Sequence, residues 1–148
     1  MRTALFVGSF DPFTIGHDNI ARRALKLFDR LVIGVGINPE KKYMFSEERR
    51  VGFIRELYSD EPRVKVVTFS DLAVDLAHRE NAHFIVKGVR STRDFEYERE
   101  MADLNQQLGD VETVLLMADP RLSSVSSTAV RQLIFFHKDY SEFIPKKK

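Results

Sequence analysis

Five short apolar runs recur along the chain, and each is followed by a stretch with helical periodicity. The apolar runs are residues 4–7, 31–36, 64–69, 84–86 and 114–117. They are mostly continuous, as expected of parallel strands that are buried on both faces. The helical stretches are residues 17–28, 46–58, 72–79, 93–108 and about 126–136. This alternation predicts an α/β fold, a single doubly wound, Rossmann-like five-stranded parallel sheet with flanking helices.

The length and composition limit the class of protein. The chain has 148 residues, 43% hydrophobic and 30% charged, which predicts one domain over residues 1–148 with a sizeable core. The net charge of +1 gives no field that favours nucleic acid or membrane partners. No apolar run approaches a membrane helix, and the apolar N-terminal stretch is too short for a secretory signal. The absence of cysteine excludes disulfides and thiolate metal sites and favours a cytoplasmic location.

The segment from Phe6 to His17 reads FVGSFDPFTIGH and carries the main functional signal. An apolar strand stops at a glycine turn, and a helix is expected to begin at or near His17. Unpaired N–H groups and the positive end of the helix dipole make such a start a phosphate site. The alternative is a turn glycine with His17 as an ordinary helix cap. A cap needs one such residue, whereas six polar or turn residues occur here at fixed offsets: Gly8, Ser9, Asp11, Thr14, Gly16 and His17.

Every polar or glycine-rich segment of interest follows one of the predicted strands. In such a sheet, ligands bind beyond the carboxyl ends of the strands, near the point where strand order reverses. These segments should therefore lie together at one edge of the sheet and form one site. They are residues 8–17, 38–42, 70–71, 87–90 and 119–128.

Two basic segments belong to this edge. The first, residues 87–90, places Lys87 and Arg90 around a glycine, which is either a basic turn or a polyphosphate site combining a point charge with a bidentate guanidinium. The second follows an Asn-Pro turn, and its spacing alone does not choose between Lys41 and Lys42. Glu98 lies in the next helical stretch and is either solvated or in contact with a ribose or a cation.

A run of hydroxyl side chains precedes the last predicted helix. Residues 123–128 contain four serines and Thr128. One hydroxyl is routine as a helix cap, but several in succession favour a second phosphate cradle. No Ser-His-Asp or Cys-His pairing is evident, so the sequence does not predict covalent catalysis.

These motifs resemble those of known enzymes. TIGH at residues 14–17 is similar to the TxGH form of the HxGH nucleotidyltransferase superfamily. Five segments in order resemble the bacterial phosphopantetheine adenylyltransferase family over nearly the whole chain. They are GSFDPFTIGH at 8–17, NPEKKYMF at 38–45, FSDL at 69–72, KGVRSTRDFEYE at 87–98 and VSSTAVR at 125–131.

The resemblance implies in-line transfer of AMP from ATP to 4′-phosphopantetheine, giving dephospho-coenzyme A and pyrophosphate, with Mg²⁺ and in a homohexamer. It implies catalytic roles for His17, Lys41 and Arg90, and leaves the metal ligands unassigned. The implied phosphopantetheine contacts are Ser9, Lys41, Ala73 and Lys87. The implied ATP contacts are Ser9, Phe10, His17, Gly88, Val89, Arg90, Glu98, Leu122, Ser123, Ser124, Val125, Ser126, Ser127 and Thr128.

The chain departs from the family pattern at three points. Lys87 stands where arginine is common, Ser9 stands where threonine is commoner, and the loop before Val125 is one residue shorter than in some relatives. Two alternatives stay open on the sequence. One is an enzyme with another acceptor, such as a mononucleotide, and the other is a nucleotide-sensing module without turnover.

Overall fold

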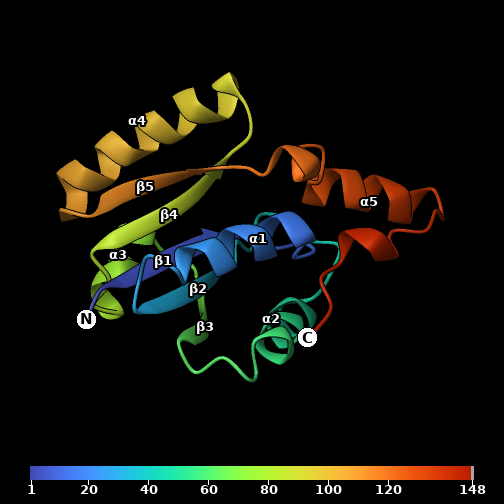
Figure 1. Cartoon of the computed structure of the whole chain (residues 1–148), viewed down its shortest axis with the longest axis horizontal. Coiled ribbons are helices and arrows are strands. Elements are labelled where there is room, and N and C mark those ends of the chain that lie inside the picture. Colours follow the sequence, from blue (N-terminus) through green and yellow to red (C-terminus); the bar gives the residue numbers. More distant parts are fainter. Residues whose placement is uncertain (148) are drawn as a thin grey trace.

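The structure, a computed structural model that describes residues 1–147, contains one five-stranded parallel sheet (Figure 1). Its strands are β1 (Thr3–Gly8), β2 (Arg30–Gly36), β3 (Val64–Phe69), β4 (Phe84–Val89) and β5 (Glu112–Met117). They lie in the order β3-β2-β1-β4-β5, so strand order reverses between β1 and β4. The predicted α/β fold is confirmed.

Helices cover both faces of the sheet, and all the α-helices except α3 begin after a serine or threonine cap. The α-helices are α1 (Ile15–Ala24), α2 (Glu47–Leu57), α3 (Ala73–Arg79), α4 (Thr92–Gly109) and α5 (Ser127–Phe135), and two 3₁₀ turns are η1 (Pro120–Leu122) and η2 (Ser141–Phe143). The side chains of Ser46, Ser91 and Ser126 each accept a hydrogen bond from the first turn of the helix that follows. Helix α5 lies beyond the carboxyl ends of β4 and β5 (Figure 1).

The core has two parts, one on each face of the sheet. In β1, Ala4 and Phe6 pack with residues of α1 and α2, whereas Leu5 packs with residues of α3. Successive side chains of a strand point to opposite faces, so both alternating sets must be apolar here. This explains why the apolar runs in the sequence are continuous.

Four predicted boundaries near the site are wrong: the end of β4, the start of β5 and both ends of α1. Strand β4 continues past residue 86, so Lys87, Gly88 and Val89 are its last residues and only Arg90 lies in the following loop. Strand β5 begins at Glu112 rather than at residue 114, and the β4–β5 ladder runs from Phe84 with Glu112 to Val89 with Met117. Helix α1 begins at Ile15 and ends at Ala24, whereas the sequence predicted residues 17–28.

Strand β1 is paired very unequally with its two neighbours. It pairs with β2 in six residue pairs, from Thr3 with Arg30 to Gly8 with Val35. It pairs with β4 only through Ala4 with Phe84 and Leu5 with Ile85. The two central strands therefore separate after Leu5, at the point where the strand order reverses. Within residues 1–147, no helix combines the length and the apolar character that crossing a bilayer requires.

Candidate active site

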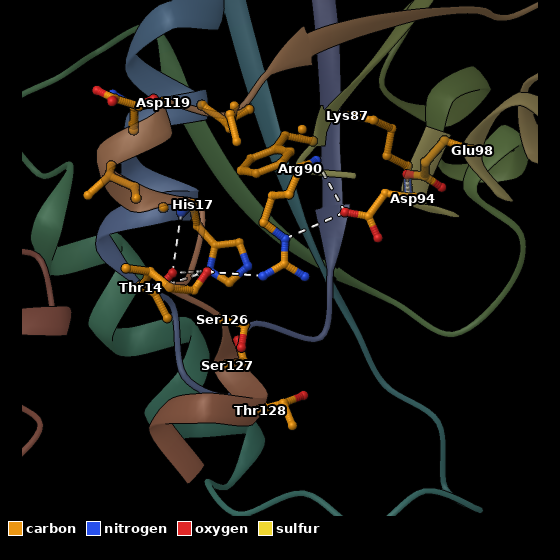
Figure 2. Close-up of a pocket in the computed structure, with 18 of the residues that line it drawn as sticks. Thr14, His17, Lys87, Arg90, Asp94, Glu98, Asp119, Ser126, Ser127 and Thr128 are labelled. Atoms are coloured by element: carbon orange, nitrogen blue, oxygen red, sulfur yellow. Dashed lines mark hydrogen bonds and ion pairs between the residues drawn. The ribbon is translucent and has the colours of Figure 1, made fainter. Parts of the chain in front are cut away.

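A cavity of about 490 Å³ lies where β1 and β4 separate, and we call it the central cavity (Figure 2). It is bounded by the ends of these two strands, the first turns of α1 and α4, and the segment that leads into α5. A second cavity of about 500 Å³, the lateral cavity, adjoins the ends of β1, β2 and β3. Lys87 lines both cavities and therefore stands at the boundary between them.

His17 is both a helix-capping residue and a wall of the central cavity. Its Nδ1 accepts a hydrogen bond from the backbone N–H of Thr14 at 2.9 Å, while its own N–H donates to Thr14 Oγ1 at 3.4 Å. An Nδ1 atom that accepts carries no proton, so the proton of the neutral ring is on Nε2. The two residues thus form a reciprocal capping box that also fixes the tautomer of the imidazole.

The surroundings of His17 keep its imidazole neutral. Burial, and second the charge of Arg90, lower the pKa of His17 to about 4. The ring packs against Phe10 and Phe13, with centroids 5.1 Å and 5.3 Å away. At neutral pH, His17 is therefore a hydrogen-bond donor through Nε2–H and carries no charge.

Arg90 supplies the positive charge beside this ring. Figure 2 shows its guanidinium directed toward His17. Its Nη1 donates to the backbone carbonyl of Val125 at 3.3 Å, and its Nε lies 3.5 Å from a carboxylate oxygen of Asp94. Arg90 thereby connects the end of β4 to the segment before α5.

The side chain of Phe10, for which the resemblance implied an ATP contact, does not line the central cavity. Its side chain is only 3% exposed and packs in the core rather than in the central cavity. Its φ of 51° is in the left-handed region, which is rare for a bulky residue, and its ring packs against Phe6 and Phe13, with centroids 5.4 Å and 5.2 Å away. A Cβ at Gly8 would lie 3.0 Å from that ring, so any larger residue at position 8 would require the ring to shift. Phe10 therefore acts on the cavity through its edge-on contact with His17.

The β4 side of the central cavity combines a cation, a glycine and a carboxylate. Lys87 Nζ lies 3.4 Å from Glu98 Oε2, so of the alternatives for Glu98 the structure contains the contact with a cation (Figure 2). Gly88 faces α1, where an added Cβ would lie 3.0 Å from Ile20 Cγ1. The side chain of Val89 is buried and does not belong to the cavity wall.

The hydroxyl-rich segment is only partly in the cavity wall. Five of its seven implied ATP contacts line the central cavity: Leu122, Val125, Ser126, Ser127 and Thr128. Ser123 and Ser124 are exposed outside it. Ser127 Oγ donates to the carbonyl of Pro12 at 2.8 Å, which joins α5 to the loop after β1. Within residues 1–147, the backbone N–H groups of Ser127 and Thr128 form no hydrogen bond, so the first turn of α5 presents free donors.

The lateral cavity brings two of the implied phosphopantetheine contacts together. Lys41 Nζ donates to Ser9 Oγ at 3.0 Å, although 32 residues separate them. Ala73 is the first residue of α3 and lies outside the walls of both cavities. The structure therefore selects Lys41 over Lys42 as the lysine that reaches this edge.

Two buried charged residues lie next to the site: Asp11, for which the sequence predicted no role apart from the turn, and Arg50, which the sequence did not single out. They are 3% and 4% exposed. Asp11 was visible only as part of an Asp-Pro turn. Arg50 had a detectable signal, because it shares the i, i+4, i+7 stripe of α2 with the buried Ile54 and Leu57.

The carboxylates of the central cavity do not form a metal cage. Among residues 1–147, no group of three or more His, Cys, Asp or Glu side chains is placed to hold a metal ion. Asp94, Glu98 and Asp119 each pair with a cationic side chain. Mg²⁺ commonly enters such sites on substrate phosphates and keeps several water ligands. The residues present fit a metal that arrives with a polyphosphate.

The chain is similar to known nucleotidyltransferases in sequence and in fold. Residues 5–133 match the cytidylyltransferase-like family. A bifunctional NMN adenylyltransferase/ADP ribose pyrophosphatase from Francisella tularensis has the same fold, with a TM-score of 0.74 and 18% identity over 99% of this chain and 46% of that one. A lipopolysaccharide core biosynthesis protein from Thermoplasma volcanium has a TM-score of 0.60 and 21% identity over 80% of this chain and 97% of its own.

Curated relatives narrow the class to one family. The phosphopantetheine adenylyltransferase of Bacteroides fragilis is 51% identical over 99% of this chain and 97% of its own length. The enzyme of that name from Porphyromonas gingivalis is 52% identical over 97% of this chain and 94% of its own. The chain belongs to the phosphopantetheine adenylyltransferase family, which confirms the resemblance found in the sequence.

Proposed function

We propose that this protein transfers AMP from ATP to 4′-phosphopantetheine, producing dephospho-coenzyme A and pyrophosphate in coenzyme A biosynthesis. The observation that carries the proposal is the pair of adjoining cavities that share Lys87. One cavity has the free N–H groups at the start of α5, together with the cationic Arg90, which favour a polyphosphate. The other has the Ser9–Lys41 pair, which favours a phosphomonoester.

The reaction needs positioning and charge stabilisation more than proton transfer. The acceptor phosphate is already ionised at neutral pH, so its oxygen attacks the α-phosphorus without a general base. One P–O bond forms to the acceptor, and the bond to the bridging oxygen breaks, with its electron pair leaving on pyrophosphate. Negative charge is redistributed over the α-phosphate oxygens during this step.

We assign these roles to four side chains. His17 donates its Nε2–H to an α-phosphate oxygen, and Arg90 supplies charge from the same wall. Lys41 and Ser9 orient the acceptor phosphate from the lateral cavity. In such preorganised sites, each donor typically contributes about two to three orders of magnitude in turnover.

We place the nucleotide in the central cavity and the acceptor across Lys87 in the lateral one. Gly88, Arg90 and Glu98 contribute the β4 side of the nucleotide site, and residues 125–128 contribute the α5 side. Mg²⁺ accompanies the triphosphate and neutralises part of its charge. The carboxylates of the central cavity wall, Asp94, Glu98 and Asp119, are the side chains that would hold it.

We further propose that residues 1–148 act as one domain in a cytoplasmic homohexamer. Helix α4 supports self-association, because a stripe at i, i+4, i+7 and i+11 on it is apolar or aromatic and largely unburied: Tyr97, Met101, Leu104 and Leu108. Exposed apolar surface of this kind marks protein interfaces. Sedimentation of the wild type and of Leu104→Glu tests it, with loss of the hexamer expected in the variant.

Pyrophosphate release tests the reaction. ATP, Mg²⁺ and phosphopantetheine should release pyrophosphate together, and omission of the acceptor should abolish release. Nicotinamide mononucleotide in place of phosphopantetheine tests the other acceptor. Release with the mononucleotide alone would contradict the proposed acceptor, and binding of ATP without release would contradict enzymatic function.

A further inference from the structure

Arg50 connects three segments that are distant in sequence. Its Nη1 donates to the backbone carbonyls of Ser9 at 2.8 Å and Gly36 at 3.0 Å, and its Nε donates to the carbonyl of Phe45 at 3.2 Å. The guanidinium carbon lies 3.9 Å from the ring centroid of Tyr43. Within residues 1–147, Arg50 pairs with no carboxylate, so its charge is satisfied by carbonyl dipoles and an aromatic face.

Asp11 binds the carboxyl end of the loop formed by residues 38–45, the loop that also contains Tyr43 and the Phe45 carbonyl. Its two carboxylate oxygens accept hydrogen bonds from the backbone N–H groups of Met44 and Phe45, each at 2.8 Å. The Tyr43 hydroxyl in turn accepts from the N–H of Asn38 at 2.9 Å. The segment from Asn38 to Phe45 is thus fixed at both of its ends.

Lys41 lies in this loop, and Ser9 is the residue whose backbone carbonyl accepts a hydrogen bond from Arg50. These two side chains meet at 3.0 Å in the lateral cavity, and the ammonium also lies 5.5 Å from the Tyr43 ring centroid. A lysine side chain is flexible, so its backbone must be placed accurately for the ammonium to return to one position. The hydrogen bonds of Arg50 and Asp11 act on the backbone on both sides of this contact.

We propose that Arg50 and Asp11 form a clamp that positions Ser9 and Lys41 for the acceptor substrate. This inference rests on the proposed function for the identity of that acceptor. Arg50 and Asp11 are positioning residues, since neither lines the central or the lateral cavity. Loss of the clamp therefore impairs acceptor binding and alignment and leaves the nucleotide site intact.

The test compares Arg50→Lys with Arg55→Ala. Lysine keeps the charge but cannot reach three carbonyls, whereas Arg55 is a matched control because it lies on the same helix and donates to a backbone carbonyl, that of Val66. We expect Arg50→Lys to lower turnover about 100-fold, because a shift of the reacting groups by about 1 Å has an effect of this size. The KM for phosphopantetheine should rise, while the affinity for ATP should stay within about twofold of the wild-type value. Equal losses for both substrates, or wild-type constants, would overturn the clamp.

A second variant covers the case in which Arg50→Lys does not fold. Asp11→Asn keeps the shape of the side chain but points an N–H₂ group at one of the two backbone donors. We expect the same selective loss toward phosphopantetheine, and a wild-type KM for it would overturn the clamp.

Amide hydrogen exchange tests the clamp independently of the enzymatic reaction. Faster exchange over residues 38–45 is expected in Asp11→Asn and not in Arg55→Ala, whether or not turnover is measured. Unchanged exchange in Asp11→Asn contradicts the clamp even if the wild type is active. Absence of pyrophosphate release by the wild type contradicts the proposed function alone.

Discussion

The imidazole of His17 caps helix α1 on Thr14 through Nδ1 and, by the same bond, turns its Nε2–H toward the central cavity. The two interpretations of His17 from the sequence, helix cap and phosphate donor, are therefore not exclusive. A hydrogen bond of 2.9 Å serves both, because it fixes where the only ring proton sits. Changes at position 17 should accordingly affect turnover and helix stability together.

The first prediction concerns turnover. His17→Ala removes the Nε2–H donor, and we expect kcat to fall by about 100- to 1,000-fold, the usual loss for one preorganised donor. ATP affinity, measured by calorimetry, should change little because the N–H groups of α5 and Arg90 remain. His83→Ala is the control, since His83 is exposed on the sheet edge away from the cavity. Near-normal turnover of His17→Ala would refute the role of His17.

The second prediction concerns the pH dependence of stability. The folded protein holds the pKa of His17 at about 4, below the ordinary value of 6.5, so the unfolded chain binds more protons between these values. The free energy of unfolding should therefore decrease as pH falls from about 6.5 to about 4. His17→Asn should flatten this part of the profile in denaturant titrations, while His83→Asn keeps the wild-type slope. A profile with the same slope in both variants would remove His17 as the cause.

The third prediction separates the two substrates at Lys87. Its ammonium lies between the cavities and pairs with Glu98, and we place the acceptor phosphate on its lateral side. Lys87→Ala should raise the KM for phosphopantetheine more than the KM for ATP. Lys87→Arg, which restores a bidentate contact, should lower the KM for phosphopantetheine toward or below the wild-type value. A larger effect on ATP would place Lys87 with the nucleotide.

The fourth prediction concerns the packing of Gly88. In Gly88→Ala, the new methyl group lies about 3 Å from Ile20. The strain of this close contact should lower the free energy of unfolding by about 1–3 kcal/mol, as overpacking does. Chemical denaturation of Gly88→Ala, Ile20→Ala and the double variant measures the coupling, because alanine at position 20 removes both of the atoms that the new methyl group would meet. The double variant should recover part of the loss, and strictly additive losses would show that Ile20 is not the obstacle.

The fold was predictable because its signals are local. Continuous apolar runs, helix caps and glycine turns all act within a few residues, and they identified all five strands and the Ser46 cap at the start of α2. The end of β4 was misjudged because Lys87 and Gly88 are poor strand formers on their own. Their conformation is imposed by pairing with β5 across the sheet.

The site was predictable only as a set of neighbouring segments. Strand ends brought the segments around His17, Lys87 and Ser126 to one edge, as the topology requires. The burial of Phe10 depends on a left-handed φ, and that of Arg50 depends on carbonyls from three separate segments. Neither condition leaves a local pattern in the sequence, because both arise from the tertiary arrangement.

The divergence of β1 from β4 has a consequence for recognition. Beyond the pair Leu5 and Ile85, the facing edges of these strands have no ladder partner in each other, so peptide N–H and C=O groups there are available to a bound molecule. Main-chain groups present the same atoms whatever residue carries them. Part of the binding specificity therefore depends on the positions of backbone groups, which a substitution of the side chains at these positions does not remove.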